Sequence, residues 1–500
     1  MMVRLHLRDA AKIRQMAIPS APAPVAASWL RFFRPSHEHS ARSAAALVMF
    51  AVMLSRVIGY LREAYIAYAF GAGPRTDAYV AAFTIPDWLN YLVAGGTASI
   101  TFISIFTRYT SEQREAAAYK AFSIIVTVMT AVLTVGIVLA EVFAPQILRV
   151  YFRDFTPEQL ELCVYLTRIL LPTQIFFYAG GIVSAVLFSK RLFLLPAFGG
   201  VFYNIFIILG GVALGSRVGI ASLAYGALAG GIIGPFLLNV IGAARVGLRY
   251  RPSFNVRDAG FREWVWLSIP LMLGVSLVAA DDWIMRYFAN GLSGEITRLN
   301  YAKRLLAVPI AVLGQAIGQA TLPFFARLYG ERKMEQFSAT VSGAVYRTAA
   351  LSLALWSAQG LYARAFYAAG DTLTPMVAGT IITVASLPMY AWLFHQYSAV
   401  GLTIASDVGI FAHTVVLVTL LHRKRLVPIS GLPWGELSKT VITALAAGVV
   451  AFYVGANVVV DGTRRADFLA LSLISITWAG AVAAGLWTTR SKLLLRLRKS

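Results

Sequence analysis

The chain has 500 residues, of which 58% are hydrophobic and only 13% are charged. Soluble domains are about 45–50% apolar and about 25% charged, so this composition excludes an ordinary soluble protein. The net charge of +21 is better explained by basic cytoplasmic loops than by nucleic-acid binding. The single cysteine, Cys163, excludes an internal disulfide and a cysteine-cluster metal site. No Gly-Lys pair occurs, so the chain has no Walker A loop and no ATPase of its own.

Residues 1–42 are the only long stretch without a spanning segment. They are rich in arginine, and the Pro19–Pro24 segment is typical of a loop. A signal peptide needs a continuous apolar core, which this stretch lacks. We therefore expect a basic, poorly ordered, cytoplasmic N-terminal extension.

Apolar stretches that are long enough to cross a bilayer follow in close succession. A spanning helix needs about 20 mostly apolar residues. The expected spans are 43–70, 78–106, 119–147, 160–188, 194–214, 218–243, 264–289, 300–326, 373–394, 399–421, 438–456 and 467–488, and a further apolar stretch lies at 346–367. The sequence thus predicts an all-α, polytopic membrane helix bundle.

The charges of the loops orient these spans. Basic loops alternate with weakly charged ones, which places both termini in the cytoplasm under the positive-inside rule. Counting spans from either terminus puts residues 327–333 and Asp371 on the same side. The intervening Ser338–Gly370 holds only 33 residues, whereas two full spans need about 40. We expect a re-entrant hairpin, a pair of half-helices or a lost helix in this segment.

The first span carries charges in the middle of its apolar run. It reads Ser55-Arg56-Val57-Ile58-Gly59-Tyr60-Leu61-Arg62-Glu63. A charge in hydrocarbon costs a few kcal/mol, about 3 for arginine, so such residues indicate function. On an ideal helix Arg56 and Glu63 share a face and Arg62 lies about 120° away, so a bend at Gly59 would bring both arginines to one cavity. The alternative is a span that ends near Gly59, with Arg62 and Glu63 reaching the outer interface.

Two later spans also carry charges. The seventh holds Asp281, Asp282 and Arg286, and the i, i+4 spacing of the last two predicts either an ion pair or a cation-coupling role. The eighth begins with Lys303 and Arg304, and Asp77 earlier in the chain has the position of a helix N-cap. Together the charges predict a cationic cavity inside the bundle. Such a cavity selects an anionic ligand, since arginine suits phosphate or carboxylate.

These residues carry a resemblance to the MurJ/MviN family of lipid II flippases, within the MOP exporter superfamily. The segments that resemble it are 55–63, Phe70–Gly73, Thr76–Tyr79, Ile85-Pro86, 94–96, Tyr301–Leu305, Leu322-Pro323 and Ala369–Thr372 before Thr374-Pro375. The resemblance implies two pseudo-symmetric lobes around a central cavity, followed by two C-terminal helices. The implied parts are the N-lobe at 43–246, a cytoplasmic linker at 247–263, the C-lobe at 264–425, and two C-terminal helices with a basic tail at 426–500.

The implied activity is transport, not enzymatic catalysis. Such proteins carry an undecaprenyl-pyrophosphate-linked peptidoglycan precursor from the inner to the outer leaflet of the cytoplasmic (inner) membrane by alternating access. The expected partners are this lipid-linked anionic substrate, the membrane and proteins of cell-wall synthesis, and no nucleic acid. No cofactor or metal is expected, and a monovalent cation or the membrane potential would drive transport.

The expected substrate-binding residues are Arg56, Arg62, Arg304, Asp77, Ser55 and Glu63. Asp281, Asp282 and Asp407 are the candidates for cation coupling, although the family's cation site does not map cleanly onto them. The chain also departs from the family pattern, with Asn90 in place of an arginine, Gly95 in place of a glutamate and Ala307 in place of a carboxylate.

The largest departure is near residues 345–370, where the family's ninth and tenth helices are merged or truncated. This predicts about thirteen hydrophobic segments, and the hypothesis that the shortened chain flips its substrate weakly or not at all. Three other functions stay open: a flippase for another undecaprenyl-linked glycan of the O-antigen or capsule type, a multidrug antiporter, which the arginines disfavour, and a non-transporting scaffold of cell-wall synthesis.

Overall fold

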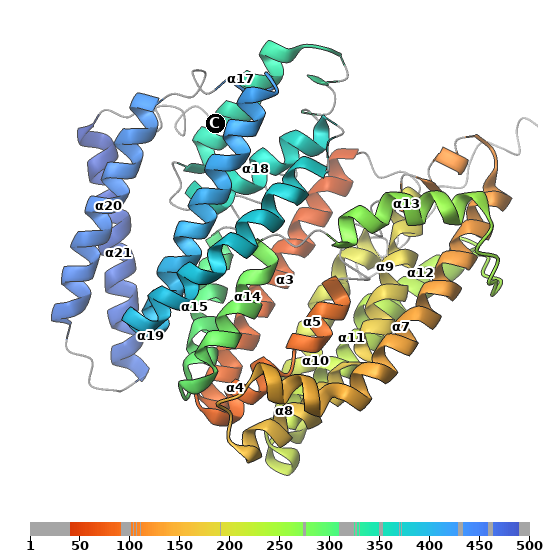
Figure 1. The fold of residues 1–500 in the computed structure, drawn as a ribbon, viewed down its shortest axis with the longest axis horizontal. Helices are drawn as coiled ribbons and strands as arrows, with labels where there is room; N and C mark the ends of the chain where they lie inside the picture. The colour runs from red at the N-terminus through yellow and green to blue at the C-terminus, as the bar shows by residue number, and fades with distance from the viewer. Residues whose placement is uncertain are drawn as a thin grey trace, which may run out of the picture.

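A computed structural model shows the arrangement of the helices (Figure 1). The residues that it describes are 41–91, 102–103, 105–106, 108–110, 112–190, 192–273, 277–309, 325, 328–329, 331–349, 354–369, 371, 373–428, 434–458 and 464–489. Within these ranges the secondary structure is helical, without a strand. The N-terminal extension that the sequence predicts lies outside the described residues, apart from its last two positions.

The N-lobe is built from long helices joined by short turns. Its elements are α3 (Ala41–Phe70), α4 (Pro74–Ala81), α5 (Thr84–Leu89), α7 (Glu115–Tyr151), α8 (Pro157–Leu170), α9 (Thr173–Ser189), α10 (Leu194–Val218), α11 (Ala221–Gly231), the π-helical turn η2 (Ile232–Leu237) and α12 (Leu238–Arg245). The start of α8 shows why the helices begin where they do: Thr156 and Gln159 form a capping box, and Pro157 occupies the first helical position.

The expected continuous span at 78–106 is wrong at its beginning, because α4 ends at Ala81 and α5 starts at Thr84. Pro86 explains the break, since it has no N–H to donate to the carbonyl of Ala82 and its ring would clash with that carbonyl. The Ala82 carbonyl instead accepts a hydrogen bond of 3.1 Å from the Thr167 hydroxyl of α8. This break turns α5 away from α4 toward the centre of the bundle.

The linker and the C-lobe follow. The chain is irregular from Leu248 to Arg257 and packs on α7, where the amide of Arg251 donates to the Ser123 hydroxyl at 3.1 Å. The elements beyond it are α13 (Ala259–Leu273), α14 (Leu277–Phe288), the 3-10 turn η3 (Ala289–Gly291), α15 (Glu295–Pro309), α17 (Met334–Ala349), α18 (Ala354–Ala368), α19 (Leu373–Arg423), α20 (Trp434–Asn457) and α21 (Arg464–Thr488). The expected linker at 247–263 therefore ends inside α13. A kink at Ser398 divides α19 and falls between the two spans expected at 373–394 and 399–421.

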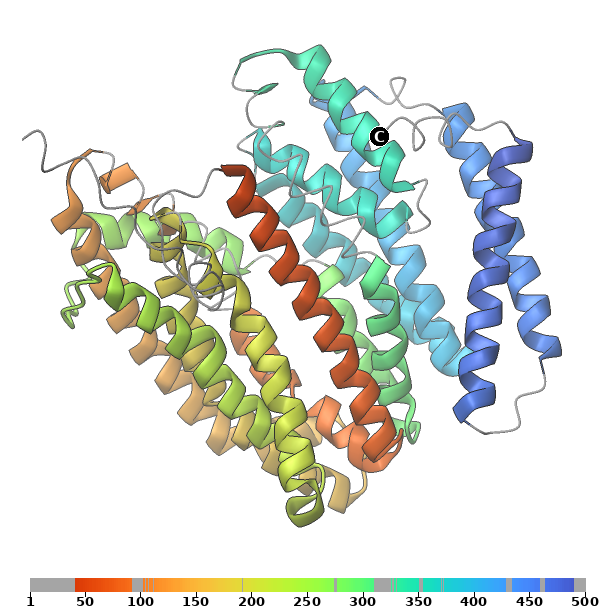
Figure 2. The same cartoon turned by 180° about the vertical axis from the view of Figure 1, so that it is seen from behind.

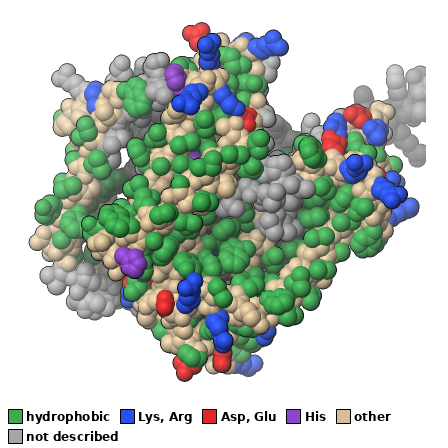
Figure 3. All heavy atoms as spheres, viewed as in Figure 1, with side chains coloured by type: hydrophobic (Ala, Val, Ile, Leu, Met, Phe, Trp, Pro, Cys, Tyr) green, Lys and Arg blue, Asp and Glu red, His purple; other side chains and the backbone are tan. Residues whose placement is uncertain are grey.

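The bundle has the surface of a membrane protein. Five helical stretches in the described residues are long and apolar enough to cross a bilayer: Glu115–Tyr151, Pro157–Ser189, Leu194–Val218, Ala221–Arg245 and Leu373–Arg423. Apolar side chains cover the middle of the face in Figure 3, and charged side chains gather toward its upper and lower ends. The prediction of an all-α membrane helix bundle is confirmed.

Helix α3 lies between the two lobes, and α20 and α21 stand as a pair at the edge beyond α19 (Figures 1 and 2). In the segment that the charge count identified, α17 and α18 form a pair of short helices that pack on each other. The structure describes 16 and 15 residues of these helices, and residues 350–353 between them lie outside the described residues. Which of the three expected arrangements this segment adopts stays a prediction. The total of thirteen segments stays a prediction.

Candidate functional site

A cavity of about 560 Å³ lies between the lobes. Helices α3, α4, α5, α8, α9 and α10 line it from the N-lobe, and α14 and α15 line it from the C-lobe. Among the described residues, its charged lining residues are Arg56, Arg62, Arg286, Arg304, Glu63 and Asp87. Four arginines and two carboxylates give the lining a formal charge of 4 − 2 = +2. The cavity is therefore cationic, as the sequence predicts.

Both arginines of α3 line this cavity, together with Ser55 and Glu63. The helix continues as one α-helix to Phe70, and where its membrane span ends stays a prediction. No sharp bend is needed, because the cavity reaches around more than one face of α3. Gly59 instead faces α10, where an added Cβ would meet the Asn204 amide at 3.6 Å.

Arg62 is held in place by α10. Its Nη1 donates to Asn204 Oδ1 at 2.8 Å, and its Nη2 pairs with the Glu63 carboxylate. The amide nitrogen of Asn204 donates in turn to the carbonyl of Gly200 at 2.9 Å. That second bond fixes which way the amide points, so its oxygen faces the guanidinium. Sequence reasoning missed Asn204, and the available signal was an amide side chain within the apolar span 194–214.

Arg304 brings the C-lobe into the site. Its Nε lies 3.8 Å from Glu63 Oε1, so this carboxylate contacts an arginine from each lobe. The structure thus brings together Ser55, Arg56, Arg62, Glu63 and Arg304, five of the six residues expected to bind substrate. Their role in binding stays a prediction.

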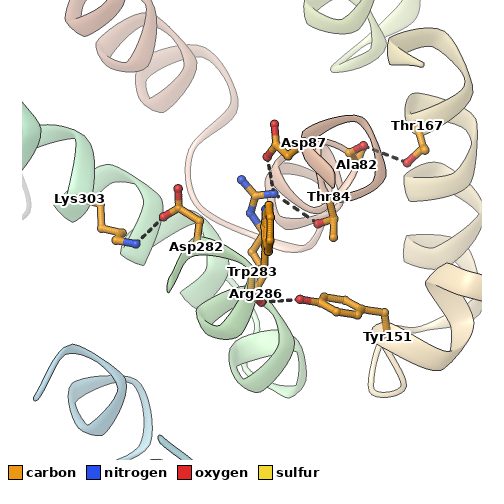
Figure 4. A network of polar contacts seen from close by, with 9 residues as sticks. All are labelled: Ala82, Thr84, Asp87, Tyr151, Thr167, Asp282, Trp283, Arg286 and Lys303. Carbon is orange, nitrogen blue, oxygen red and sulfur yellow. Dashed lines mark hydrogen bonds and ion pairs between the residues drawn. The ribbon is translucent and has the colours of Figure 1, made fainter. Parts of the chain in front are cut away.

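Arg286 of α14 also enters the cavity and contacts α5 (Figure 4). Its Nη1 donates to Asp87 Oδ2 at 2.9 Å and to Thr84 Oγ1 at 3.3 Å. The expected i, i+4 ion pair with Asp282 is wrong, because the partner in the other lobe takes the guanidinium. A second bond between the lobes lies nearby, where the Tyr151 hydroxyl donates to the carbonyl of Trp283 at 2.6 Å.

The candidates for cation coupling are not lining residues of the cavity. Asp281 and Asp282 on α14 both pair with the Lys303 ammonium of α15, and Asp281 also accepts from the Tyr390 hydroxyl of α19. Asp407 lies on the second arm of α19 and is exposed. In the part of the chain that the structure describes, no three His, Cys, Asp or Glu side chains gather to hold a metal ion.

The structure places Asp77 outside the cavity, contrary to its expected role in binding substrate. Asp77 is 1% exposed and caps the start of α15 across the lobe boundary. Its Oδ1 accepts from the amide of Thr297 at 2.9 Å and from the hydroxyl of Thr297 at 2.6 Å, and its Oδ2 accepts from the amide of Gly294. The expected N-cap position of Asp77 is wrong, because α4 begins at Pro74 and its N-cap is Gly73; Asp77 instead caps a helix of the other lobe.

More bonds join the lobes at the same end of the bundle. The Tyr301 hydroxyl donates to the carbonyl of Gly71 at 3.3 Å, and the amide of Asp154 donates to Asn290 Oδ1 at 2.8 Å. This end, which we call the sealed end, consists of the turns after α3, α7 and α14. It lies opposite the end at which α3 begins (Figure 2).

Comparison with known proteins identifies a matching family. The family model described as "Lipid II flippase MurJ" matches residues 66–354 and 334–461. A lipid II flippase MurJ of Burkholderia cenocepacia is 30% identical over 296 residues, 57% of this chain and 57% of that protein. A probable lipid II flippase MurJ of Buchnera aphidicola is 24% identical over 454 residues, 81% of this chain and 89% of that protein. The chain thus spans just over half of the first relative and nearly all of the second.

Solved structures match the fold. A structure titled "Lipid II flippase MurJ, inward closed conformation" superimposes with a TM-score of 0.70 at 18% identity, covering 89% of this chain and 99% of that one. An outward-facing multidrug transporter of the MATE family, in the MOP superfamily, gives a TM-score of 0.56 at 16% identity over 78% of this chain and 97% of that one. At these identities the match establishes the fold alone.

Proposed function

Because the chain belongs to the lipid II flippase MurJ family, we propose that it moves lipid II, a lipid-linked peptidoglycan precursor, between the leaflets of the membrane. It is a multi-pass protein of the inner membrane, as its family and its apolar helices indicate. The proposed activity is transport rather than catalysis, and its other partners are proteins of cell-wall synthesis.

The observation that carries this proposal is the cationic cavity between the lobes. Its formal charge of +2 matches a pyrophosphate, and guanidinium groups can bind phosphate oxygens in pairs. The low dielectric of a bundle in lipid strengthens this attraction relative to water. The same charge repels the cationic compounds that a multidrug antiporter would carry, which disfavours that alternative.

The sealed end supports alternating access. The bonds of Asp77, Tyr301 and Asp154 hold the lobes together at this end of the cavity. The positive-inside rule places the start of α3 and both termini in the cytoplasm, so the sealed end faces outward. The cavity in this conformation therefore serves the inner leaflet. Release on the other side requires these bonds to break, driven by the membrane potential or by a cation.

The arginines of the cavity provide the test. We expect Arg56→Ala, Arg62→Ala and Arg304→Ala each to lower transport about 10- to 100-fold, the loss for a charge-assisted hydrogen bond of about 1.5–3 kcal/mol. Each variant is expressed in a strain depleted of its own flippase. Growth is recorded, and lipid II in the outer leaflet is measured with an added enzyme that cannot cross the membrane.

Arg217→Ala is the matched control, since it removes the same charge from an exposed position at the end of α10. It should keep full activity. Normal growth together with normal outer-leaflet lipid II in all three cavity variants would contradict the proposal and favour a non-transporting scaffold. Growth defects without any change in lipid II would instead point to another undecaprenyl-linked glycan as the cargo.

A further inference from the structure

Two adjacent carboxylates of α14 share one ammonium. The Lys303 Nζ contacts Asp281 Oδ2 and Asp282 Oδ1 (Figure 4 shows the second contact). The Asp281 side chain is 0% exposed, and the Lys303 side chain is 24% exposed. A carboxylate that is fully removed from solvent requires a counter-charge, and Lys303 supplies it.

A third helix completes the cluster. The hydroxyl of Tyr390, itself 0% exposed, donates to Asp281 Oδ1, so each oxygen of this carboxylate has a partner from a different helix. Asp407, on the other arm of α19, interacts electrostatically with Tyr390. Arg286 and Arg304 also attract Asp282 electrostatically. However, the guanidinium of Arg286 donates to Asp87, and Arg304 lines the cavity. Lys303 is therefore the cation that directly contacts both aspartates.

We propose that the Lys303 ammonium is the tethered counter-cation of the C-lobe and fills a site that would otherwise hold a free monovalent cation. Carboxylate oxygens of Asp281 and Asp282 from α14 contact it, and carboxylate oxygens are the hard ligands that alkali and alkaline-earth cations take. An ammonium carries the same charge as Na⁺. Because it is covalently attached to the chain, it balances the negative charge of the cluster permanently. The inference deepens the proposed function, because it means that transport by this chain needs no free cation at this position.

Arg304, the residue after Lys303, connects this cluster to the cavity. Lys303 and Arg304 are consecutive on α15, and Arg304 reaches Glu63 of α3. The ion pairs of Lys303 hold this turn of α15 against α14, and Asp281 is bonded in turn to Tyr390 of α19. These contacts therefore help to set the position of Arg304. Lys303 is in this sense a positioning residue.

Removing the tethered cation tests the inference. Purified protein in detergent is unfolded by heat while tryptophan fluorescence is followed, with NaCl exchanged for choline chloride at constant ionic strength. We expect no sodium-specific change for the unaltered chain or for Lys303→Arg, which keeps the charge. We expect Lys303→Ala to gain a saturable rise in Tm of about 2 °C or more in sodium. The double variant Lys303→Ala, Asp281→Asn should lose that gain.

Two results would overturn the inference. One is a Lys303→Ala protein that elutes as a folded monodisperse species and responds equally to sodium and choline. The other is a sodium-specific rise in Tm of the unaltered chain that Asp281→Asn abolishes, a measurement that needs no Lys303 variant to fold. Lys303→Met keeps the side-chain stem and replaces the alanine variant if that one is unstable. No lipid substrate is present, so failure here leaves the proposed transport activity untouched.

Discussion

Asp77→Ala should open the sealed end of the bundle. The change removes a buried acceptor of three hydrogen bonds that join α4 to the start of α15. A charge-assisted bond contributes about 1.5–3 kcal/mol, but part of this returns when Gly294 and Thr297 are hydrated in the open state. A net loss on the order of 3 kcal/mol shifts the balance between sealed and open states about a hundredfold.

Cysteine accessibility measures that shift. Cys163, the only cysteine and a buried one, is replaced by alanine, and Asn300→Cys places a thiol in the cavity wall. A maleimide that cannot cross the membrane is then added from outside. Labelling should be slow in the parent chain and much faster with Asp77→Ala, whereas Glu158→Ala, an exposed acidic residue at the same end, should change nothing. Equal labelling rates in all three proteins would refute the reasoning that Asp77 holds this end shut.

Two further predictions concern residues that act through a neighbour. Asn204→Leu removes the acceptor of Arg62 and should lower outer-leaflet lipid II about tenfold, whereas Asn204→Asp keeps an acceptor and should retain most activity; equal effects of both would contradict a positioning role. Burial alone would raise the pKa of the Asp371 carboxyl, but hydrogen bonds from Lys424 and Thr374 outweigh it and hold that pKa below its ordinary value. The resulting stabilisation is present above about pH 4 and lost as pH falls through the lowered pKa. Asp371→Asn should therefore reduce Tm at pH 7, by the equivalent of about 1 kcal/mol, and the gap in Tm should narrow as the pH falls below about 4. A gap independent of pH would exclude the charge as its cause.

The charged lining of the cavity could be predicted because charges are costly in hydrocarbon and therefore stand out in an apolar sequence. One apolar run is interrupted by Arg56, Arg62 and Glu63, and another begins at Arg304. The sequence alone therefore identifies these charged residues as candidates for a function. Membrane spans were visible for the same reason, and the kink of α19 fell between two predicted spans.

The hydrogen-bond and ion-pair partners of these residues were harder to predict. The spacing of residues along one helix does not show which side chains a neighbouring helix places against them. Arg286 has Asp282 four residues before it, yet it bonds with Asp87 of α5. Lys303 then takes Asp282 instead. The break between α4 and α5 depends on Thr167 of α8, which satisfies the carbonyl that Pro86 leaves without a donor. Each of these choices is made by tertiary contacts between segments far apart in sequence.

The shortened segment near 345–370 has its own core, which bears on the hypothesis that the chain is inactive. Phe337 of α17, Leu361 and Phe366 of α18 and Leu417 of α19 are all 0% exposed and pack in one cluster. Among the described residues, the helices that line the cavity are α3, α4, α5, α8, α9, α10, α14 and α15, and no lining residue comes from 334–369. The shortening therefore spares both the packing of this part of the C-lobe and the charged lining of the cavity. We accordingly expect the unaltered chain to restore normal growth to the depleted strain, which is the opposite of what its shortened sequence first suggested.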